Sequence, residues 1–212
     1  MSGSESHVAH HFPDLEVQSH AARLGMWLFL ATEVLLFAGL FTAYALYRML
    51  YPSAFHGASK LIETSMGALN TVVLITSSLT VALAFHYSRQ SRNRLAALLL
   101  VVTIGLGFVF LGVKAVEYAH HFHEGHLPGR FYRYAGLQVP GAPMFFTVYF
   151  LMTGLHGIHV VIGMGVLTWL AVGAWRGSYG GEYTTPIEVG GMYWHLVDLI
   201  WIFLFPLLYL ID

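Results

Sequence analysis

Several ionisable side chains stand inside stretches of sequence that are otherwise apolar. His195 and Asp198 interrupt the run "YWHLVDLIWIFLFPLLYL" at residues 193–210, and Glu33 interrupts "LFLATEVLLFAGLF". A charged residue at the centre of a membrane helix is unfavourable by roughly 2.5–3.5 kcal/mol even on the most lenient insertion scales. Such residues are therefore candidates for proton transfer, for ion binding, or for polar contacts between helices.

Two histidines share one face of another apolar stretch. His156 and His159 lie three residues apart in "TGLHGIHVVIG", a spacing that brings both rings to the same side of a helix. The glycines around them allow a neighbouring helix to approach closely. We predict a buried polar cluster that joins these histidines to Glu33, His195 and Asp198. The structural alternative is that each side chain only holds two helices together through a hydrogen bond worth about 1 kcal/mol.

Metal chemistry is the sharper alternative, and "EYAHHFHEGH" at residues 117–126 is where it would be expected. Glu117-x-x-His120 is half of a carboxylate-bridged di-iron site, but such bundles need two of these motifs and two further glutamates. The sequence contains one motif, and Lys114 is placed to pair with Glu117 at the end of a helix. We therefore interpret Lys114 and Glu117 as a helix-end polar pair.

Histidines continue beyond this motif into a predicted loop. The four of them are His120, His121, His123 and His126. Four close histidines could bind adventitious zinc or copper, but we favour a solvated loop, and no metal site is predicted. Haem ligation by an imidazole is chemically open, but the sequence identifies no second ligand for it.

The composition places these residues in a membrane protein. Of the 212 residues, 57% are hydrophobic and 10% are charged, whereas a soluble domain has about 25% charged residues. We predict an all-α polytopic membrane protein, a bundle of five transmembrane helices of about 20 or more residues each. The predicted helices cover residues 24–47, 65–87, 95–118, 144–175 and 190–211.

The segments outside these helices leave little room for a soluble domain. Residues 1–22 are polar and His-rich, and we expect an N-terminal extension ahead of a membrane domain at 23–212. Glycine and proline in the connection 119–143 predict an irregular loop outside the membrane. The basic connection "RQSRNR" at 89–94 favours a cytoplasmic N-terminus, because short loops follow the positive-inside rule. The net charge of −1 argues against a nucleic-acid partner, and the lack of cysteine excludes iron–sulfur clusters.

Four stretches, in order, resemble the subunit III family of the haem-copper oxidases. "RLGMWLFLATEVLLFAGLFTAY" is similar to the first helix shared by that family, and "KAVEYAHH" to its Glu-Tyr helix end. "FLMTGLHGIHVVIGMGVL" and "YWHLVDLIWIFLFPLLYL" resemble its two last helices. The resemblance runs from about Arg23 to the C-terminus. It groups the chain with the five-helix members, because the larger members have two additional helices at the N-terminus.

The resemblance implies an accessory, non-catalytic subunit of a cytochrome c oxidase in the bacterial plasma (inner) membrane. It implies docking on catalytic subunit I and other oxidase subunits, whose haem and copper do the redox chemistry. A respiratory supercomplex is a further candidate partner, and the sequence does not decide membership of one. It also implies bound phospholipid and a role in proton uptake and turnover stability. Glu33 then corresponds to the family's buried carboxylate, and the proton- and lipid-associated interior is completed by His156, His159, His195 and Asp198.

Other functions remain as alternatives. The five-helix relatives include subunit III of quinol oxidases and a homologue associated with nitric oxide reductase. A free-standing metal-binding membrane enzyme should purify with stoichiometric iron or copper. A small transporter should have broken helices or an internal repeat, whereas this sequence has a single kink candidate in its last span, Pro206, and no repeat.

Overall fold

The computed structural model describes residues 8–180 and 183–210, which contain helices and no β-strand. In order these are α1 (Leu15–Leu50), α2 (Pro52–Ser59), α3 (Thr64–Arg89), α4 (Asn93–Glu124), the 3₁₀ turn η2 (Gly129–Phe131), α5 (Ala142–Trp175), α6 (Thr185–Phe205) and the π-helical turn η3 (Pro206–Leu210). Five helices, the last formed by α6 with η3, are long and apolar enough to cross a membrane. The predicted all-α bundle of five transmembrane helices is confirmed.

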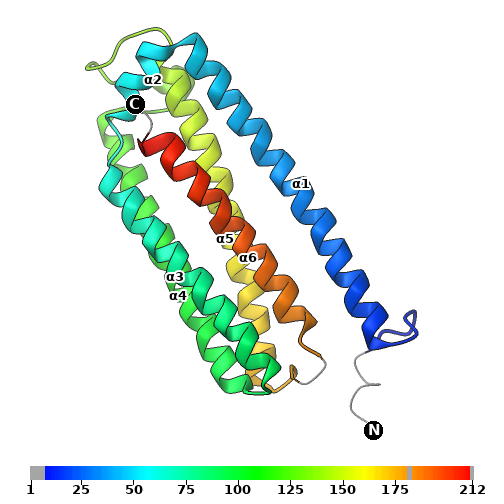
Figure 1. Cartoon of the computed structure of the whole chain (residues 1–212). Helices are drawn as coiled ribbons and strands as arrows, with labels where there is room; N and C mark the ends of the chain where they lie inside the picture. Colours follow the sequence, from blue (N-terminus) through cyan, green and yellow to red (C-terminus); the bar gives the residue numbers. More distant parts are fainter. Residues whose placement is uncertain (1–7, 181–182, 211–212) are drawn as a thin grey trace.

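The helices form an elongated bundle in which α1 lies at one side (Figure 1). α3 and α4 are an antiparallel pair on the other side, and α5 and α6 lie between them and α1. α4 packs on α5, α3 packs on α6, and α1 packs on both α5 and α6. The first turn of α1 and the turn η3 lie at opposite ends of the bundle, as an odd number of spans requires.

Local capping explains why α1 begins at Leu15, nine residues before the predicted start at residue 24. The Asp14 carboxylate is the N-cap and accepts a hydrogen bond from the backbone N–H of Val17 at 2.8 Å. Hydropathy detects the apolar part of a helix only, so the polar first turns were assigned to the extension 1–22. The division of the chain after residue 22 stays a prediction.

α4 is also longer than predicted, at its C-terminal end. It continues to Glu124 and ends at Gly125, whose φ of +82° is the left-handed conformation that glycine adopts most readily. The prediction that the loop begins at residue 119 is therefore wrong for residues 119–124. The histidines made this segment polar and so hid a helix that projects past the apolar span.

Two tryptophans of α6 fill the centre of the bundle. Trp194 and Trp201 are both fully buried. Trp194 lies against Gly163 of α5, where an added Cβ would be 2.9 Å from the indole ring. The expected close approach at a glycine therefore occurs at Gly163, whereas a Cβ on Gly157 would meet nothing within 4 Å.

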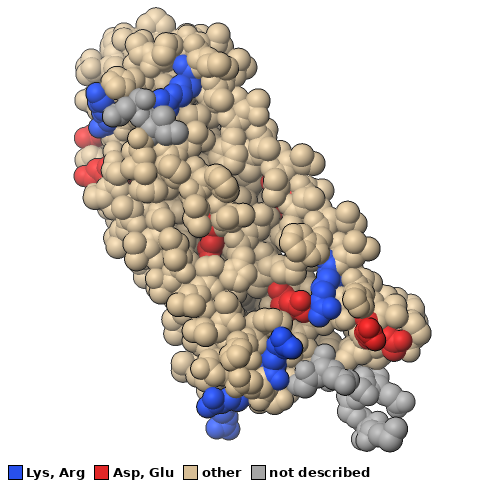
Figure 2. All heavy atoms as spheres, viewed as in Figure 1, with Lys and Arg blue, Asp and Glu red and all other residues tan. Residues whose placement is uncertain are grey.

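The surface between the two ends of the bundle carries few charges. Figure 2 shows Lys and Arg atoms near both ends and a broad, mostly uncharged belt between them. The exposed apolar residues of α1 include Leu28 and Leu35, whose exposed fractions are 63% and 71%. Such a surface contacts lipid or another apolar protein surface, because contiguous exposed apolar area is unfavourable in water.

Candidate functional site

Glu33 and His159 form a contact between α1 and α5. Glu33 Oε2 lies 2.8 Å from His159 Nε2, and the two side chains keep only 15% and 11% of their surface exposed. The other ring nitrogen, Nδ1, is 2.8 Å from the carbonyl oxygen of Leu155. Tyr193 of α6 donates a hydrogen bond from its hydroxyl to the carbonyl of His159 at 3.2 Å. Side chains of α1 and α6 therefore both bond His159, the first at its ring and the second at its backbone carbonyl.

The hydrogen-bond partners of His159 determine its protonation. A carbonyl oxygen can only accept, so Nδ1 carries a proton and donates it to Leu155. The contact between Nε2 and Glu33 then requires one further proton, held either by the imidazole or by the carboxyl group. The pair is thus an ionic imidazolium–carboxylate or a neutral imidazole–carboxylic acid, related by movement of one proton across 2.8 Å.

His156, one turn earlier on α5, lies apart from this pair. It is fully buried, and neither ring nitrogen has a hydrogen-bond partner among the described residues. Its ring packs against Phe110 and Trp201, with centroid separations of 5.4 and 5.3 Å. His156 therefore behaves as a core aromatic side chain in this structure.

His195 and Asp198 of α6 face α3. His195 Nδ1 lies 2.6 Å from the hydroxyl oxygen of Ser78, and Asp198 Oδ2 lies 3.4 Å from that of Ser77. Ser77 has a nearer acceptor, the carbonyl of Leu74 at 2.7 Å, so its single hydroxyl proton binds Asp198 weakly. Asp198 Oδ1 is buried without a hydrogen-bond partner among the described residues.

The structure thus divides the predicted cluster into separate contacts. Glu33 and His159 are together, as expected, whereas His195 and Asp198 contact the serines of α3 and His156 packs among aromatic rings. The sequence did not indicate the partners on α3, because a serine in an apolar helix is common. The adjacent pair "SS" at residues 77–78 was the available signal.

Lys114 and Glu117 form the most extensively bonded polar group of the described residues. Lys114 Nζ donates to Glu117 Oε2 at 3.0 Å, and their side chains are 8% and 3% exposed. The pair lies seven residues or more before the end of α4, inside the bundle, whereas the sequence placed it at a helix end. The difference follows from the continuation of α4 to Glu124.

Two tyrosines complete this group. Lys114 Nζ donates to the hydroxyl oxygens of Tyr149 and Tyr209 at 3.0 and 2.9 Å. Each of these hydroxyls donates in turn to Glu117 Oε1, at 2.5 and 2.6 Å. All four side chains are buried and bonded, and we name them the Lys114 network. Tyr209 reaches it from η3, the turn that begins at Pro206, so the sequence had no simple spacing that could place it there.

Two more polar contacts hold α1, one towards each end. At its N-terminal end Arg23 donates two hydrogen bonds to the carboxylate of Glu188, both at 2.9 Å. At its other end the hydroxyl of Tyr44 donates to the carbonyl of Leu207 at 2.8 Å. With Glu33 these contacts occur about every three helical turns along α1.

Apolar grooves lie beside α1 between these contacts. One has a volume of about 480 Å³ and is lined by Trp27 and Leu30 of α1, Ile75 of α3, and His195 and Asp198 of α6. A second, of about 450 Å³, is lined by residues of α1, α5 and α6, among them Met26, Trp169 and Tyr193. Both grooves have walls that are almost entirely apolar, which suits hydrocarbon chains better than a polar substrate.

The end of α4 brings together His121, Glu124 and His126. Their nitrogen and carboxylate ligand atoms all lie within 4.8 Å of one another. His121 and His126 are 1% and 0% exposed, so the prediction of a solvated loop is wrong for these two histidines. Burial lowers the pKa of His126, while the nearby Glu124 carboxylate acts in the opposite direction. A neutral imidazole is the form that binds metals.

Five apolar spans with polar groups enclosed between them define a polytopic helical membrane protein, and comparison with known proteins identifies its family. The family model described as cytochrome c oxidase subunit III matches residues 4–212, so the chain belongs to this family. The resemblance to subunit III of the haem-copper oxidases is thereby confirmed. The subunits of this family carry no redox centre and work within multi-subunit oxidases.

Individual relatives cover almost the whole chain. The quinol oxidase subunit 3 of Bacillus subtilis is 30% identical, over 92% of this chain and 91% of its own length. The cytochrome c oxidase subunit 3 of a Synechocystis species is 31% identical, over 98% of this chain and 80% of its own length. The chain is therefore an oxidase subunit III whose relatives include both kinds of oxidase.

Proposed function

We propose that this chain is the accessory subunit III of a proton-pumping terminal oxidase in a bacterial plasma membrane. It docks on catalytic subunit I and other oxidase subunits, carries no haem or copper of its own, and sustains proton uptake during turnover. Membership of the family and the five apolar spans support this assignment. The single Glu-x-x-His motif supports it as well, because its glutamate is fully engaged in the Lys114 network.

The observation that carries the proton role is the contact between Glu33 and His159. One proton is shared across 2.8 Å in a site that keeps a little exposure towards the surface of α1. Movement of this proton between the two groups leaves the summed charge of the pair at zero. A subunit that supports proton uptake needs a group of this kind at membrane depth.

Phospholipid is the ligand we propose for the grooves beside α1. The groove lined by Trp27, Ile75 and Asp198 has walls that are mostly apolar, with His195 and Asp198 as its ionisable lining residues. Filling it with Ile75→Trp should displace phospholipid that co-purifies with the oxidase. Leu79→Trp is the matched control, since Leu79 is also on α3 and is 60% exposed. Native mass spectrometry of both variants measures the bound lipid, and equal lipid content would contradict the assignment.

For the electron donor we propose cytochrome c, and quinol is the second candidate. The stretch "ATEVLLF" around Glu33 favours the first. The second is favoured by the relative from Bacillus subtilis, which is named as a subunit of a quinol oxidase. Oxygen consumption by the purified complex with reduced cytochrome c or with a quinol as the only donor distinguishes them.

The orientation we propose has the start of α1 in the cytoplasm. The basic connection "RQSRNR" then lies inside, and the histidine-rich end of α4 lies outside. A cysteine introduced at Ser91 should be labelled by an impermeant reagent only in inside-out vesicles. A cysteine at Arg130 should be labelled only in right-side-out vesicles, and the reverse pattern would overturn the orientation.

The experiment that tests the function as a whole removes this chain from the complex. We expect the remaining complex to keep its haem and copper and most of its initial rate of oxygen consumption, but to inactivate within a time course that the intact complex survives. Adding the chain back should restore sustained activity. Metal that leaves with the chain would instead favour a free-standing metalloenzyme. An immediate loss of all activity with the partner intact would refute the accessory role.

A further inference from the structure

The backbone at the end of α4 presets the positions of two histidines. His126 donates its backbone N–H to the carbonyl of His121 at 2.9 Å, and Gly125 donates to the carbonyl of Phe122 at 3.4 Å. This pair of hydrogen bonds around a left-handed glycine is a Schellman motif. In that motif the residues corresponding to His121 and His126 face each other, and they are usually apolar. Here both positions are histidine.

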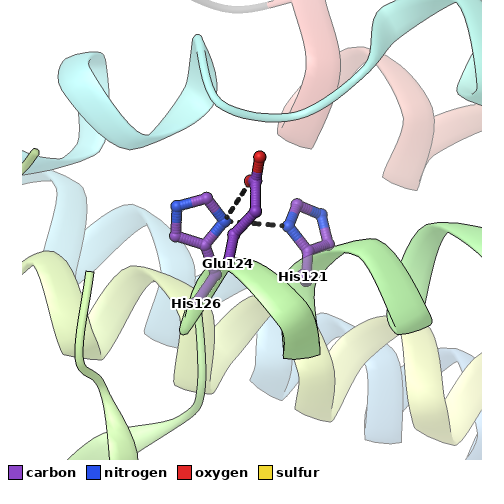
Figure 3. A group of neighbouring side chains, drawn as sticks. All are labelled: His121, Glu124 and His126. Atoms are coloured by element: carbon purple, nitrogen blue, oxygen red, sulfur yellow. Dashed lines mark hydrogen bonds and ion pairs between the residues drawn. The ribbon is translucent and has the colours of Figure 1, made fainter.

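The two imidazole rings face each other with nitrogen against nitrogen. His121 Nδ1 and His126 Nδ1 are 3.2 Å apart, and Glu124 Oε2 is 3.2 Å from His126 Nδ1. Figure 3 shows the Glu124 carboxylate above the space between the two rings. Three potential ligand atoms therefore lie close together. A hydrogen bond between the two Nδ1 atoms would account for the histidines alone and would leave the position of the Glu124 carboxylate unexplained.

These separations match the edges of a tetrahedral metal site. Zinc binds imidazole nitrogen at about 2.0–2.1 Å, so two nitrogens on a tetrahedral ion are about 3.3 Å apart. The separations of 3.2 Å agree with this edge. The remaining edge, from His121 to Glu124, closes by rotation of the glutamate, which is 39% exposed and free of the packing that fixes the rings.

The surroundings hold the rings in place. The His126 ring stacks on Phe146 at 4.8 Å with an interplanar angle of 3°, and the Tyr134 ring makes an edge contact with it at 4.3 Å. His120 Nε2 lies 3.2 Å from Glu124 Oε1, the oxygen that does not face His126. An outer partner of this kind orients the carboxylate of a metal site. Two buried imidazoles held by packing and one exposed carboxylate that can turn toward them form the ligand set.

We propose that His121, Glu124 and His126 bind one zinc ion, with the fourth position taken by water. The ion would join the end of α4 to the loop that follows it, where Arg133 already donates its backbone N–H to the carbonyl of Gly125 at 2.9 Å. The apolar grooves beside α1 have none of these three residues in their walls. The proposal is independent of the proposed proton and lipid functions.

Zinc alone is the probe for the test. The full-length chain in detergent is stripped with a chelator, loaded with Zn²⁺, passed over a metal-free desalting column, and analysed for zinc per chain by mass spectrometry. Co²⁺ loading is the second measurement, because tetrahedral cobalt has intense visible absorption bands. We expect about one zinc per chain and a tetrahedral cobalt spectrum.

Four variants locate the ion. His126→Phe keeps a ring that stacks on Phe146 and should abolish binding, and Glu124→Ala changes an exposed residue, so the fold is retained while affinity falls at least tenfold. His120→Ala should weaken binding by about 10–100-fold, as loss of an outer partner does. His123→Ala is the matched control, an exposed histidine of the same helical turn, and should bind as the unchanged chain does.

Each outcome decides the proposal. Zinc retained by the unchanged chain and by His123→Ala, but lost from His126→Phe and Glu124→Ala, supports the site. Less than one tenth of a zinc per chain in the unchanged protein overturns it. Equal zinc in His123→Ala and Glu124→Ala also overturns it, because the ion would then be held by exposed histidines. Circular dichroism of each variant verifies that the helices are intact.

Discussion

The Lys114 network and the Glu33–His159 contact are both buried ionisable groups, but they are built differently. In the network four side chains from α4, α5 and η3 bond one another, and every donor and acceptor that faces inward has a partner. The contact on α1 joins only two side chains, Glu33 and His159, which keep 15% and 11% of their surface exposed. We expect the first arrangement to stabilise the fold and the second to exchange a proton during turnover, as the proposed function requires.

The largest expected effect comes from breaking the network at its anion. Glu117→Gln leaves the Lys114 ammonium buried without a counter-charge, and removal of one partner of a buried pair destabilises by about 3–5 kcal/mol. The free energy of unfolding of the chain, from denaturant titration in detergent micelles, measures this. The double variant Lys114→Met with Glu117→Gln should recover most of the loss. Equal instability of the single and double variants would show that the charge is not the cause.

A smaller effect is expected from one hydroxyl of the same network. Tyr209→Phe removes a donor to Glu117 and an acceptor from Lys114, which should destabilise the chain by about 1–3 kcal/mol. The same unfolding titration measures it, with Tyr51→Phe, a half-exposed tyrosine, as the control. If both variants unfolded alike, the hydroxyl of Tyr209 would have no special role.

On α1 the effect on stability should be smaller still, and the effect on turnover larger. Glu33→Gln can keep a hydrogen bond to His159 but cannot exchange a proton, so we expect less than about 1 kcal/mol of destabilisation. The oxidase that contains it should start at the normal rate and inactivate early. Glu16→Gln, an exposed change on the same helix, is the control. If the Glu33→Gln complex inactivated as slowly as the unchanged complex, the contact between Glu33 and His159 would have a structural role only.

The smallest effect is expected where α6 meets α3. Ser78→Ala removes the hydrogen bond to His195, and interhelical hydrogen bonds in membranes average about 0.6 kcal/mol. Unfolding titration should place this variant within about 1 kcal/mol of the unchanged chain. A loss above about 2 kcal/mol would mean that His195 belongs to a larger network than the two residues indicate.

The sequence predicted the bundle well because membrane insertion depends on hydropathy, which is a local property. The five spans were therefore found, while the ends at Leu15 and Glu124 were missed, because caps and polar turns determine those ends. The contact of Glu33 with His159 followed from depth, burial and a shared interior. The partners of Asp198 and the buried state of His121 did not, since the rotation of each helix about its axis is decided by packing against its neighbours.

The Lys114–Glu117 pair and the Glu33–His159 pair are completed at different times during synthesis of the chain. Lys114 and Glu117 are three residues apart, so they leave the ribosome almost together and enter the membrane as a pair. Glu33 and His159 are separated by 126 residues, which at 5–20 residues per second corresponds to roughly 6–25 s of synthesis. During that interval α1 is already inserted while its partner histidine does not yet exist. The Glu33 carboxyl group therefore has no histidine partner until α5 has been synthesised.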